Sequence, residues 1–114
     1  MATETDAEVQ TRVLLKLKLI VAGESAEAAD LSVVNDVFDS RIEYMRDEGV
    51  CWWANDEVPM SVCDPLAEYL TFYCCSEFDI NPAEYQVRSQ IGERDLRRLS
   101  AKRSQGASIQ VDYF

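Results

Sequence analysis

Five basic side chains near the end of the chain form the only basic cluster in the sequence. Arg94, then Arg97 or Arg98, and then Lys102 follow one another at three- and four-residue steps, so a helix would place them on one face. Arg103 comes directly after them. Such a face can bind phosphates, or it can bind the acidic surface of a neighbouring subunit. It can also simply favour the negative end of its own helix dipole. All three interpretations remain open from the sequence.

The residue types that usually carry catalysis or bind metals lack the partners that such chemistry needs. The chain has 21 acidic residues, four cysteines and no histidine. Paired carboxylates act as acid and base in a pocket that shifts their pKa, whereas these acids follow the polar sides of predicted helices. A nucleophilic cysteine would lack its usual histidine base, and no two cysteines form a C-x-x-C pair for zinc. We therefore expect a non-enzymatic protein without metal or cofactor, with reduced structural thiols at Cys51, Cys63, Cys74 and Cys75.

The C-terminal residues alternate between apolar and polar side chains. Ile109, Val111 and Tyr113 fall on one side, and Gln110 and Asp112 on the other. This pattern predicts a short strand that has no pairing partner of its own. The strand can dock on residues 50–53 of the same subunit or add to a sheet of a partner, and we favour a partner because residues 104–108 provide reach. The proposed contact residues are Ile109, Val111, Tyr113 and Phe114.

Composition and charge limit the class of protein. A chain of 114 residues with 47% apolar residues is expected to form one folded domain. The net charge of −10 argues against non-specific nucleic-acid binding by the surface as a whole. Residues 1–80 carry 17 acids and 5 bases, whereas residues 81–114 carry 4 acids and 6 bases. An acidic body and a mildly basic end can pack against each other between copies, although a solvated acidic surface is the simpler interpretation. We see no signal peptide and no apolar run long enough to span a bilayer.

Hydrophobic periodicity predicts an all-α fold, a four-helix bundle-like domain over residues 1–103 with an extended C-terminal arm over residues 104–114. A tryptophan pair at Trp52 and Trp53 is expected to be extended, as a short edge strand or an apolar clip, and to fill the core or an inter-subunit contact. Gly92 lies within the last helix and indicates a bend or a close approach by another helix. We expect the first helix to run from a cap at Thr5 to Gly23, with residues 1–4 frayed. The second helix runs over about 26–48, with Ser25 as its cap and Gly49 at its end. The third covers about 60–77, and the fourth runs over about 82–102 after a cap at Asn81.

The order of these elements resembles the head-to-tail connector (adaptor) proteins of tailed bacteriophages, which lie below the portal ring. The resemblance covers about residues 10–80, and the basic helix and the tail agree with it in kind. It is carried by the following residues: Ala22-Gly23-Glu24, Asp47-Glu48-Gly49, Trp52-Trp53, Asp56-Glu57-Val58-Pro59 and Pro65-Leu66-Ala67-Glu68-Tyr69. The turn of two acids, an aliphatic residue and a proline before an apolar helix is the best of these motifs.

The resemblance implies a small helical bundle that assembles as a dodecameric ring in the virion, at the head–tail junction. Such a ring extends the portal channel for double-stranded DNA, without sequence-specific binding, and gives the tail or nozzle protein a platform. The C-terminal arm would anchor on the portal protein. The resemblance assigns no individual channel residue. A separate hypothesis is that the acidic helix over 26–48 lines the channel, where like charge repels DNA and lets it slide, and the candidates are Asp36, Asp39 and Glu43. Assembly would take place in the bacterial cytoplasm, and no membrane is involved.

An acidic binding module is the alternative. A protein that mimics DNA or sequesters a host protein needs a high density of negative charge, which this chain has. Such a mimic has no evident need for an apolar C-terminal arm, so removal of residues 104–114 separates the two functions.

Overall fold

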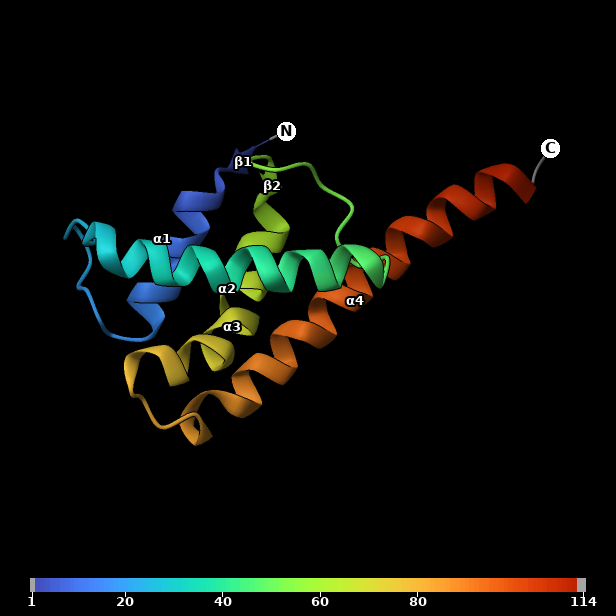
Figure 1. The fold of residues 1–114 in the computed structure, drawn as a ribbon. Helices are drawn as coiled ribbons and strands as arrows, with labels where there is room; N and C mark the ends of the chain where they lie inside the picture. The colour runs from blue at the N-terminus through green and yellow to red at the C-terminus, as the bar shows by residue number, and fades with distance from the viewer. Residues whose placement is uncertain (1, 113–114) are drawn as a thin grey trace.

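The computed structural model describes residues 2–112, with side chains described as far as Arg103. Within these residues the all-α class is confirmed, because the fold consists of helices and one very small sheet (Figure 1). The elements in chain order are β1 (Thr3–Glu4), α1 (Asp6–Lys16), α2 (Ala28–Asp47), β2 (Val58–Pro59), α3 (Met60–Cys74), the 3₁₀ turn η1 (Cys75–Phe78) and α4 (Ala83–Asp112).

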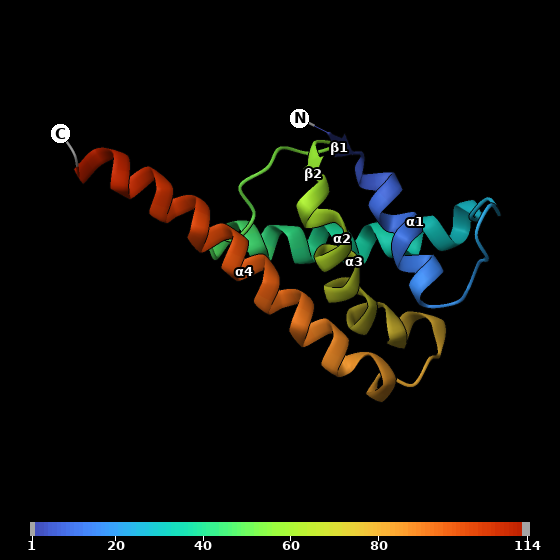
Figure 2. The ribbon, with the colours of Figure 1, turned by 180° about the vertical axis from the view of Figure 1, so that it is seen from behind.

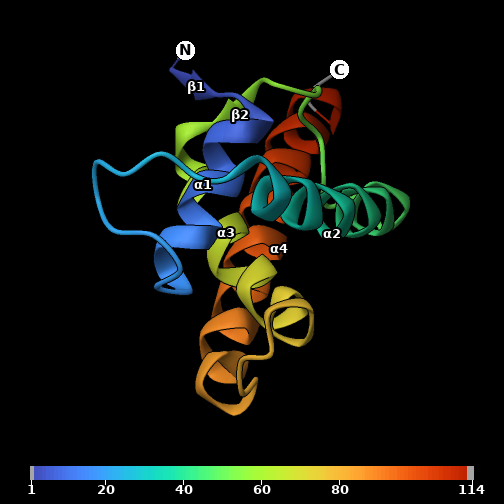
Figure 3. The same cartoon turned by 60° about the vertical axis from the view of Figure 1, so that its left-hand side comes forward.

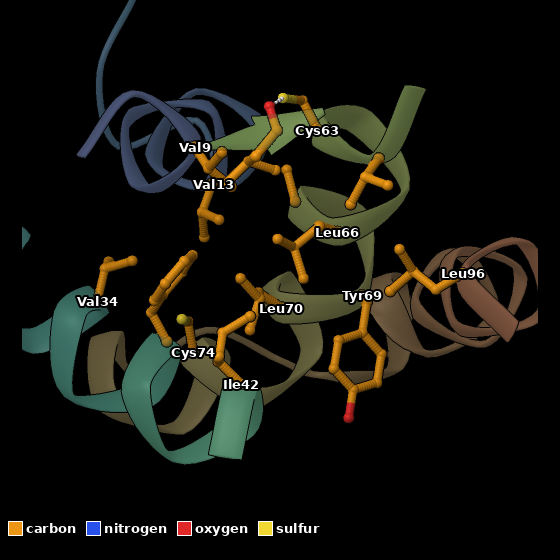
Figure 4. Packing of buried hydrophobic residues seen from close by; sticks show 14 of the residues in the cluster. Val9, Val13, Val34, Ile42, Cys63, Leu66, Tyr69, Leu70, Cys74 and Leu96 are labelled. Carbon is orange, nitrogen blue, oxygen red and sulfur yellow. Dashed lines mark hydrogen bonds between the residues drawn. The ribbon is translucent and has the colours of Figure 1, made fainter. Parts of the chain in front are cut away.

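Helix α3 lies at the centre and contacts each of the other three helices. It lies between α1 and α2 on one side and α4 on the other (Figures 2 and 4). This placement follows from its sequence, because α3 is apolar on most of its surface and every such side has to be covered. Its buried side chains include Val62, Leu66, Tyr69 and Leu70. Around them lie Val9 and Val13 of α1, Val34 and Ile42 of α2, and Leu96 of α4 (Figure 4).

The helix ends follow from local capping chemistry. The Thr5 hydroxyl accepts from the Glu8 backbone N–H at 3.2 Å while the Glu8 carboxylate accepts from the Thr5 N–H at 3.0 Å, a complete capping box. Gly49 ends α2 with φ of 77°, as predicted, and Val50 donates back to the Met45 carbonyl at 2.8 Å. At the start of α4, the Asn81 side chain accepts from the Ala83 N–H at 3.1 Å.

The prediction that α1 runs to Gly23 is wrong, because α1 already ends at Lys16. Lys18 adopts φ of 64°, and Leu19 donates to the Leu14 carbonyl at 3.0 Å. This is the hydrogen-bond pattern of a glycine-terminated helix, formed here with lysine in the left-handed position. Leu17 and Ile20 are nevertheless buried. The helical spacing of apolar residues therefore continues past Lys16, and for this reason the sequence pattern did not reveal where the helix ends.

Residues near the N-terminus are paired rather than frayed. Strands β1 and β2 are antiparallel, with Thr3 opposite Pro59 and Glu4 opposite Val58. Asp6 and Asp56 reinforce this pairing with two reciprocal hydrogen bonds. The Asp56 backbone N–H donates to the Asp6 carboxylate at 3.1 Å, and the Asp6 backbone N–H donates to the Asp56 carboxylate at 3.0 Å.

The segment after α2 is an apolar clip and not a strand. Val50, Cys51 and Trp53 are buried, and Trp52 is half-buried against Trp53. The expected core role of the tryptophan pair therefore holds for Trp53. Ser25 does not cap α2, which begins after Glu27 without a side-chain cap.

The extended C-terminal arm is also a correction. Helix α4 continues without a break to Asp112, well beyond the expected end near residue 102. A helix satisfies its backbone N–H and C=O groups within the segment, whereas a lone strand leaves them unpaired. Ile109 and Val111 therefore lie in helical backbone, although their side chains lie outside the described part of the chain. Tyr113 and Phe114 lie outside it altogether.

Gly92 marks a close approach of α4 to α3, as its position within a helix indicated. A Cβ atom at this position would lie 2.6 Å from the Pro65 carbonyl oxygen and 2.9 Å from the Tyr69 nitrogen. Both are backbone atoms and cannot turn aside. The same crossing is held by the Ser89 hydroxyl, which donates to the Tyr69 carbonyl at 2.7 Å.

We expect Gly92→Ala to lower the free energy of unfolding by about 2 kcal/mol, because the added methyl group forces the two backbones apart. In an open helix the same change stabilises by up to about 1 kcal/mol, so the sign of the effect tests the close approach. Urea unfolding followed by circular dichroism measures it, with the exposed Gln90→Ala as the matched control. Stabilisation of the Gly92→Ala variant would show that the two helices do not touch here.

Candidate interaction surfaces

The predicted basic face is divided in two by the structure. Arg94 and Arg98 project from α4 with 72% and 70% of their side chains exposed, and Lys102 is exposed one turn further on. Arg97 is not part of this face. Its guanidinium binds Glu93 at 3.0 Å and Glu48 at 3.4 Å, and it thereby ties α4 to the end of α2. Arg103 also has a partner within the subunit, since its guanidinium lies over the Trp52 ring, 5.4 Å from the ring centre.

The predicted acidic face is exposed, and its members form one stripe of α2, because they follow one another at steps of three and four residues. Asp36, Asp39 and Glu43 are all exposed. Asp36 lines a groove of about 420 Å³ between α2 and the end of α3. Asp39 and Glu43 line a second groove of about 540 Å³ between α2 and the loop that follows it. The acidic stripe therefore runs between the two grooves, with Asp36 at the edge of one and Asp39 and Glu43 at the edge of the other.

A cluster of ionised side chains holds α1, α3 and α4 together, and sequence reasoning missed it. Glu68 of α3 accepts two hydrogen bonds of 2.9 Å from the Arg88 guanidinium and one of 2.9 Å from the Lys16 ammonium. Lys16 also binds Asp64 at 2.7 Å. We call Lys16, Asp64, Glu68 and Arg88 the Glu68 cluster. Glu68 is 52 positions from Lys16 and 20 positions from Arg88, so no local motif joins the three helices in the sequence.

Lys16 and Glu68 each have two oppositely charged partners in the Glu68 cluster. Burial by itself raises the pKa of Glu68, but the hydrogen bonds and charges of Arg88 and Lys16 outweigh it, and the pKa lies below its usual value. The pKa of Lys16 is raised, because its two carboxylate partners outweigh its partial burial. Each group is thereby held in its charged form at neutral pH. This arrangement stabilises the fold and offers neither a proton donor nor a base near pH 7.

A second feature that the sequence did not indicate is an arginine among aromatic rings. The Arg41 guanidinium lies 4.1 Å from the centre of the Tyr73 ring and 4.4 Å from that of Tyr44, and it donates at 2.9 Å to the Tyr69 hydroxyl. Burial and loss of solvation raise the pKa of Tyr69 above its usual value. Arg41 is therefore packed between α2 and α3, where it lines the groove that Asp36 also lines.

All four thiols are buried, as predicted. Burial raises the pKa of each, to about 11 for Cys63 and about 12 for Cys74. Cys63 contacts the carbonyl oxygens of Val58 and Pro59 at 3.6 and 3.3 Å (Figure 4). Thiols in this state are poor nucleophiles at neutral pH. Within residues 2–112, no three side chains of cysteine and carboxylate type are placed to hold a metal ion together.

Comparisons of the chain with models of protein families, with curated proteins and with solved structures found no match. Among the described residues, none of the helices has the length and apolarity that a crossing of a lipid bilayer requires. The functional argument therefore depends on the surfaces described above.

We expect Glu68→Gln to lower the free energy of unfolding by about 2 kcal/mol at pH 7, because two charged donors lose their charged acceptor. The pKa of Glu68 is depressed in the fold, so its contribution is present above the unfolded value, about 4.3, and is lost as pH falls. Urea unfolding at several pH values should show the difference between the two proteins shrinking below about pH 4. The exposed Glu57→Gln is the control, and a difference that does not vary with pH would contradict this role.

Proposed function

We propose that this chain is a structural virion protein, an adaptor that forms a ring beneath the portal, extends the DNA channel and carries the tail. One observation supports this best. Helix α4 leaves the body of the domain after its last described contacts, Ser100 to the Gly49 carbonyl and Arg103 to Trp52, and its backbone extends away from the other helices (Figures 1 and 2). Figure 3 shows the same helix passing behind α2 toward the C-terminus.

The projecting part of α4 provides the reach that an anchor needs. Residues 104–112 extend the helix by about 13 Å at about 1.5 Å per residue. The molecule measures 53 × 28 × 22 Å along its principal axes, so this helix accounts for much of its long dimension. A helix whose described contacts to its own subunit end at Arg103 suits an apolar groove on another protein. The residues of this chain that we propose to anchor it on the portal protein are those named from the sequence, Ile109, Val111, Tyr113 and Phe114. Ile109 and Val111 are two positions apart in helical backbone, so they contact different sides of such a groove.

The distribution of charge is compatible with a protein that surrounds DNA without gripping it. The net charge of −10 and the exposed carboxylates on α2 repel phosphates. In the proposed ring, which we expect to be dodecameric, Asp36, Asp39 and Glu43 are the candidate channel-facing acids. Asp39 and Glu43 line the same groove beside α2 and are the stronger pair for this role.

An acidic binding module that mimics DNA is the second candidate, and the same exposed carboxylates favour it. A mimic would use the acidic face of α2 alone and would not need the projecting end of α4. The two functions therefore predict opposite results for a shortened chain.

We expect native mass spectrometry to detect a portal ring that carries a stoichiometric ring of this chain, and removal of residues 104–114 to abolish the association. The shortened protein should keep its melting temperature within about 2 °C, since the described contacts of α4 end at Arg103. That thermal measurement is the folding control. A full-length chain that does not bind the portal would refute the adaptor function. A shortened chain that still binds the portal would refute the anchoring role of residues 104–114.

We expect Asp39→Lys with Glu43→Lys to slow DNA packaging or ejection in particles built with the variant, because lysines on a channel wall attract the phosphates that carboxylates repel. Quantifying packaged DNA and its delivery to host cells measures the effect. The matched control is Glu24→Lys with Glu57→Lys, which reverses two exposed charges on loops. Normal DNA retention and delivery by the α2 variant would show that Asp39 and Glu43 do not line the channel.

A further inference from the structure

One face of α4 is exposed, and its character changes from apolar to basic along its length. The face that packs on the body consists of Tyr85, Ser89, Gly92, Leu96 and Ser100, all of them buried. The opposite face carries four residues at steps of four, three and four, which a helix aligns in one ridge. We call this ridge the α4 stripe, and it consists of Val87, Ile91, Arg94 and Arg98.

The α4 stripe has the side chains of an interface and no described partner that satisfies them. Val87 and Ile91 are 63% and 44% exposed, among the largest exposed apolar side chains of the body. Arg94 and Arg98 both approach the single carboxylate of Asp95, each at 3.7 Å, which is too long for a good hydrogen bond. Arginine and large apolar side chains side by side are typical of protein–protein contacts.

A groove on the other side of α3 has matching character. It has a volume of about 420 Å³ and lies between α2 and the end of α3, and we call it the α2 groove. Its apolar lining is Val33, Val37 and Tyr73, and its polar lining is Asp36, Ser40, Arg41 and Glu77. Arg41 stacks on Tyr73 and so remains part of the wall. No ion pair joins Asp36 or Glu77 to another described side chain.

The charges of the two helices are equal and opposite. Residues 28–47 carry five acids and two bases, a net of −3, whereas residues 83–103 carry three acids and six bases, a net of +3. Such surfaces attract each other and select the partner's orientation. Within one subunit the described contact between them is at the end of α2, where Arg97 binds Glu48, because α3 lies between the rest of α2 and α4 (Figure 2).

We propose that the α4 stripe of one copy docks in the α2 groove of a second copy. Val87 and Ile91 then cover Val33, Val37 and Tyr73, while Arg94 and Arg98 lie beside Asp36 and Glu77. The two surfaces are different and share no residue, so each copy that gives its stripe keeps its own groove open for the next. This head-to-tail contact closes into a ring when the rotation per subunit divides a full turn. The inference rests on the proposed function for the closure of that ring, whereas the contact itself is testable on the chain alone.

The test uses two charge-reversed variants. The first carries Arg94→Glu and Arg98→Glu, so its stripe and its groove are both acidic. The second carries Asp36→Lys and Glu77→Lys, so its stripe and its groove are both basic. Native mass spectrometry of concentrated protein, alone and on the portal, should show association of the wild type. Each variant alone should associate only at a protein concentration about a hundredfold higher or more than the wild type needs, because like charges then face each other.

Mixing the two variants in equal amounts is the decisive step. Every stripe then finds a groove of opposite charge, and we expect assemblies to return with the two variants in equal numbers. Lys18→Glu with Glu24→Lys, exposed and outside both surfaces, is the matched control and should assemble like the wild type. A mixture that stays monomeric would overturn the proposal, as would single variants that assemble normally or a wild type that does not self-associate under either condition.

Two results distinguish this contact from its alternatives. A chain that self-associates through the stripe and the groove but ignores the portal would refute the adaptor and keep the contact. A portal-bound ring that is unaffected by either variant would refute the contact and keep the adaptor. If the stripe variant instead loses DNA retention with its ring intact, Arg94 and Arg98 bind phosphates and the proposal fails.

Discussion

The apolar surface of α3 is the constraint on which the rest of the structure depends. A helix with Val62, Leu66, Tyr69 and Leu70 fully buried cannot remain at the edge of a small domain. It has to be covered from several directions, and α1, α2 and α4 each cover one. The ionised side chains of the Glu68 cluster lie at the border of this apolar contact, where α1, α3 and α4 converge, and they fix the relative positions of the three helices.

Because α3 separates α2 from α4, the domain keeps its acidic helix and its basic helix apart. Only the end of α2 reaches α4, through the ion pair between Glu48 and Arg97 and the hydrogen bond from Ser100 to Gly49. The remaining carboxylates of α2 and the two exposed arginines of α4 therefore have to find water, counterions or another molecule. This separation connects the core of the fold to its proposed assembly, since a two-layer bundle would have neutralised these charges internally.

The features that could be predicted from sequence depend on local chemistry. The capping of α1 by Thr5, the end of α2 at Gly49 and the start of α4 after Asn81 were each visible as a single residue with one physical meaning. Gly92 left a bend or a close approach open, and the structure shows the close approach. The Glu68 cluster and the pairing of β1 with β2 were not, because their partners are far apart along the chain. The early end of α1 was missed for another reason: Lys18 occupies a position that glycine usually marks. The alternation at the C-terminus suggested a strand. A strand without a neighbour leaves its backbone N–H and C=O groups unpaired, whereas the continuation of α4 pairs them within the helix.

The central position of α3 also has a consequence for the order in which the chain is synthesised. Helices α1 and α2 leave the ribosome first, yet much of the apolar surface that covers them belongs to α3. The contacts that secure α1, from Asp6 to Asp56 and from Lys16 to Glu68, span 50 and 52 residues, whereas the bond from Ser89 to Tyr69 spans 20. Closing the longer loops costs about 0.8 kcal/mol more in chain entropy than closing the shorter one. We therefore expect nascent chains to expose the faces of α1 and α2 that α3 covers until α3 has emerged.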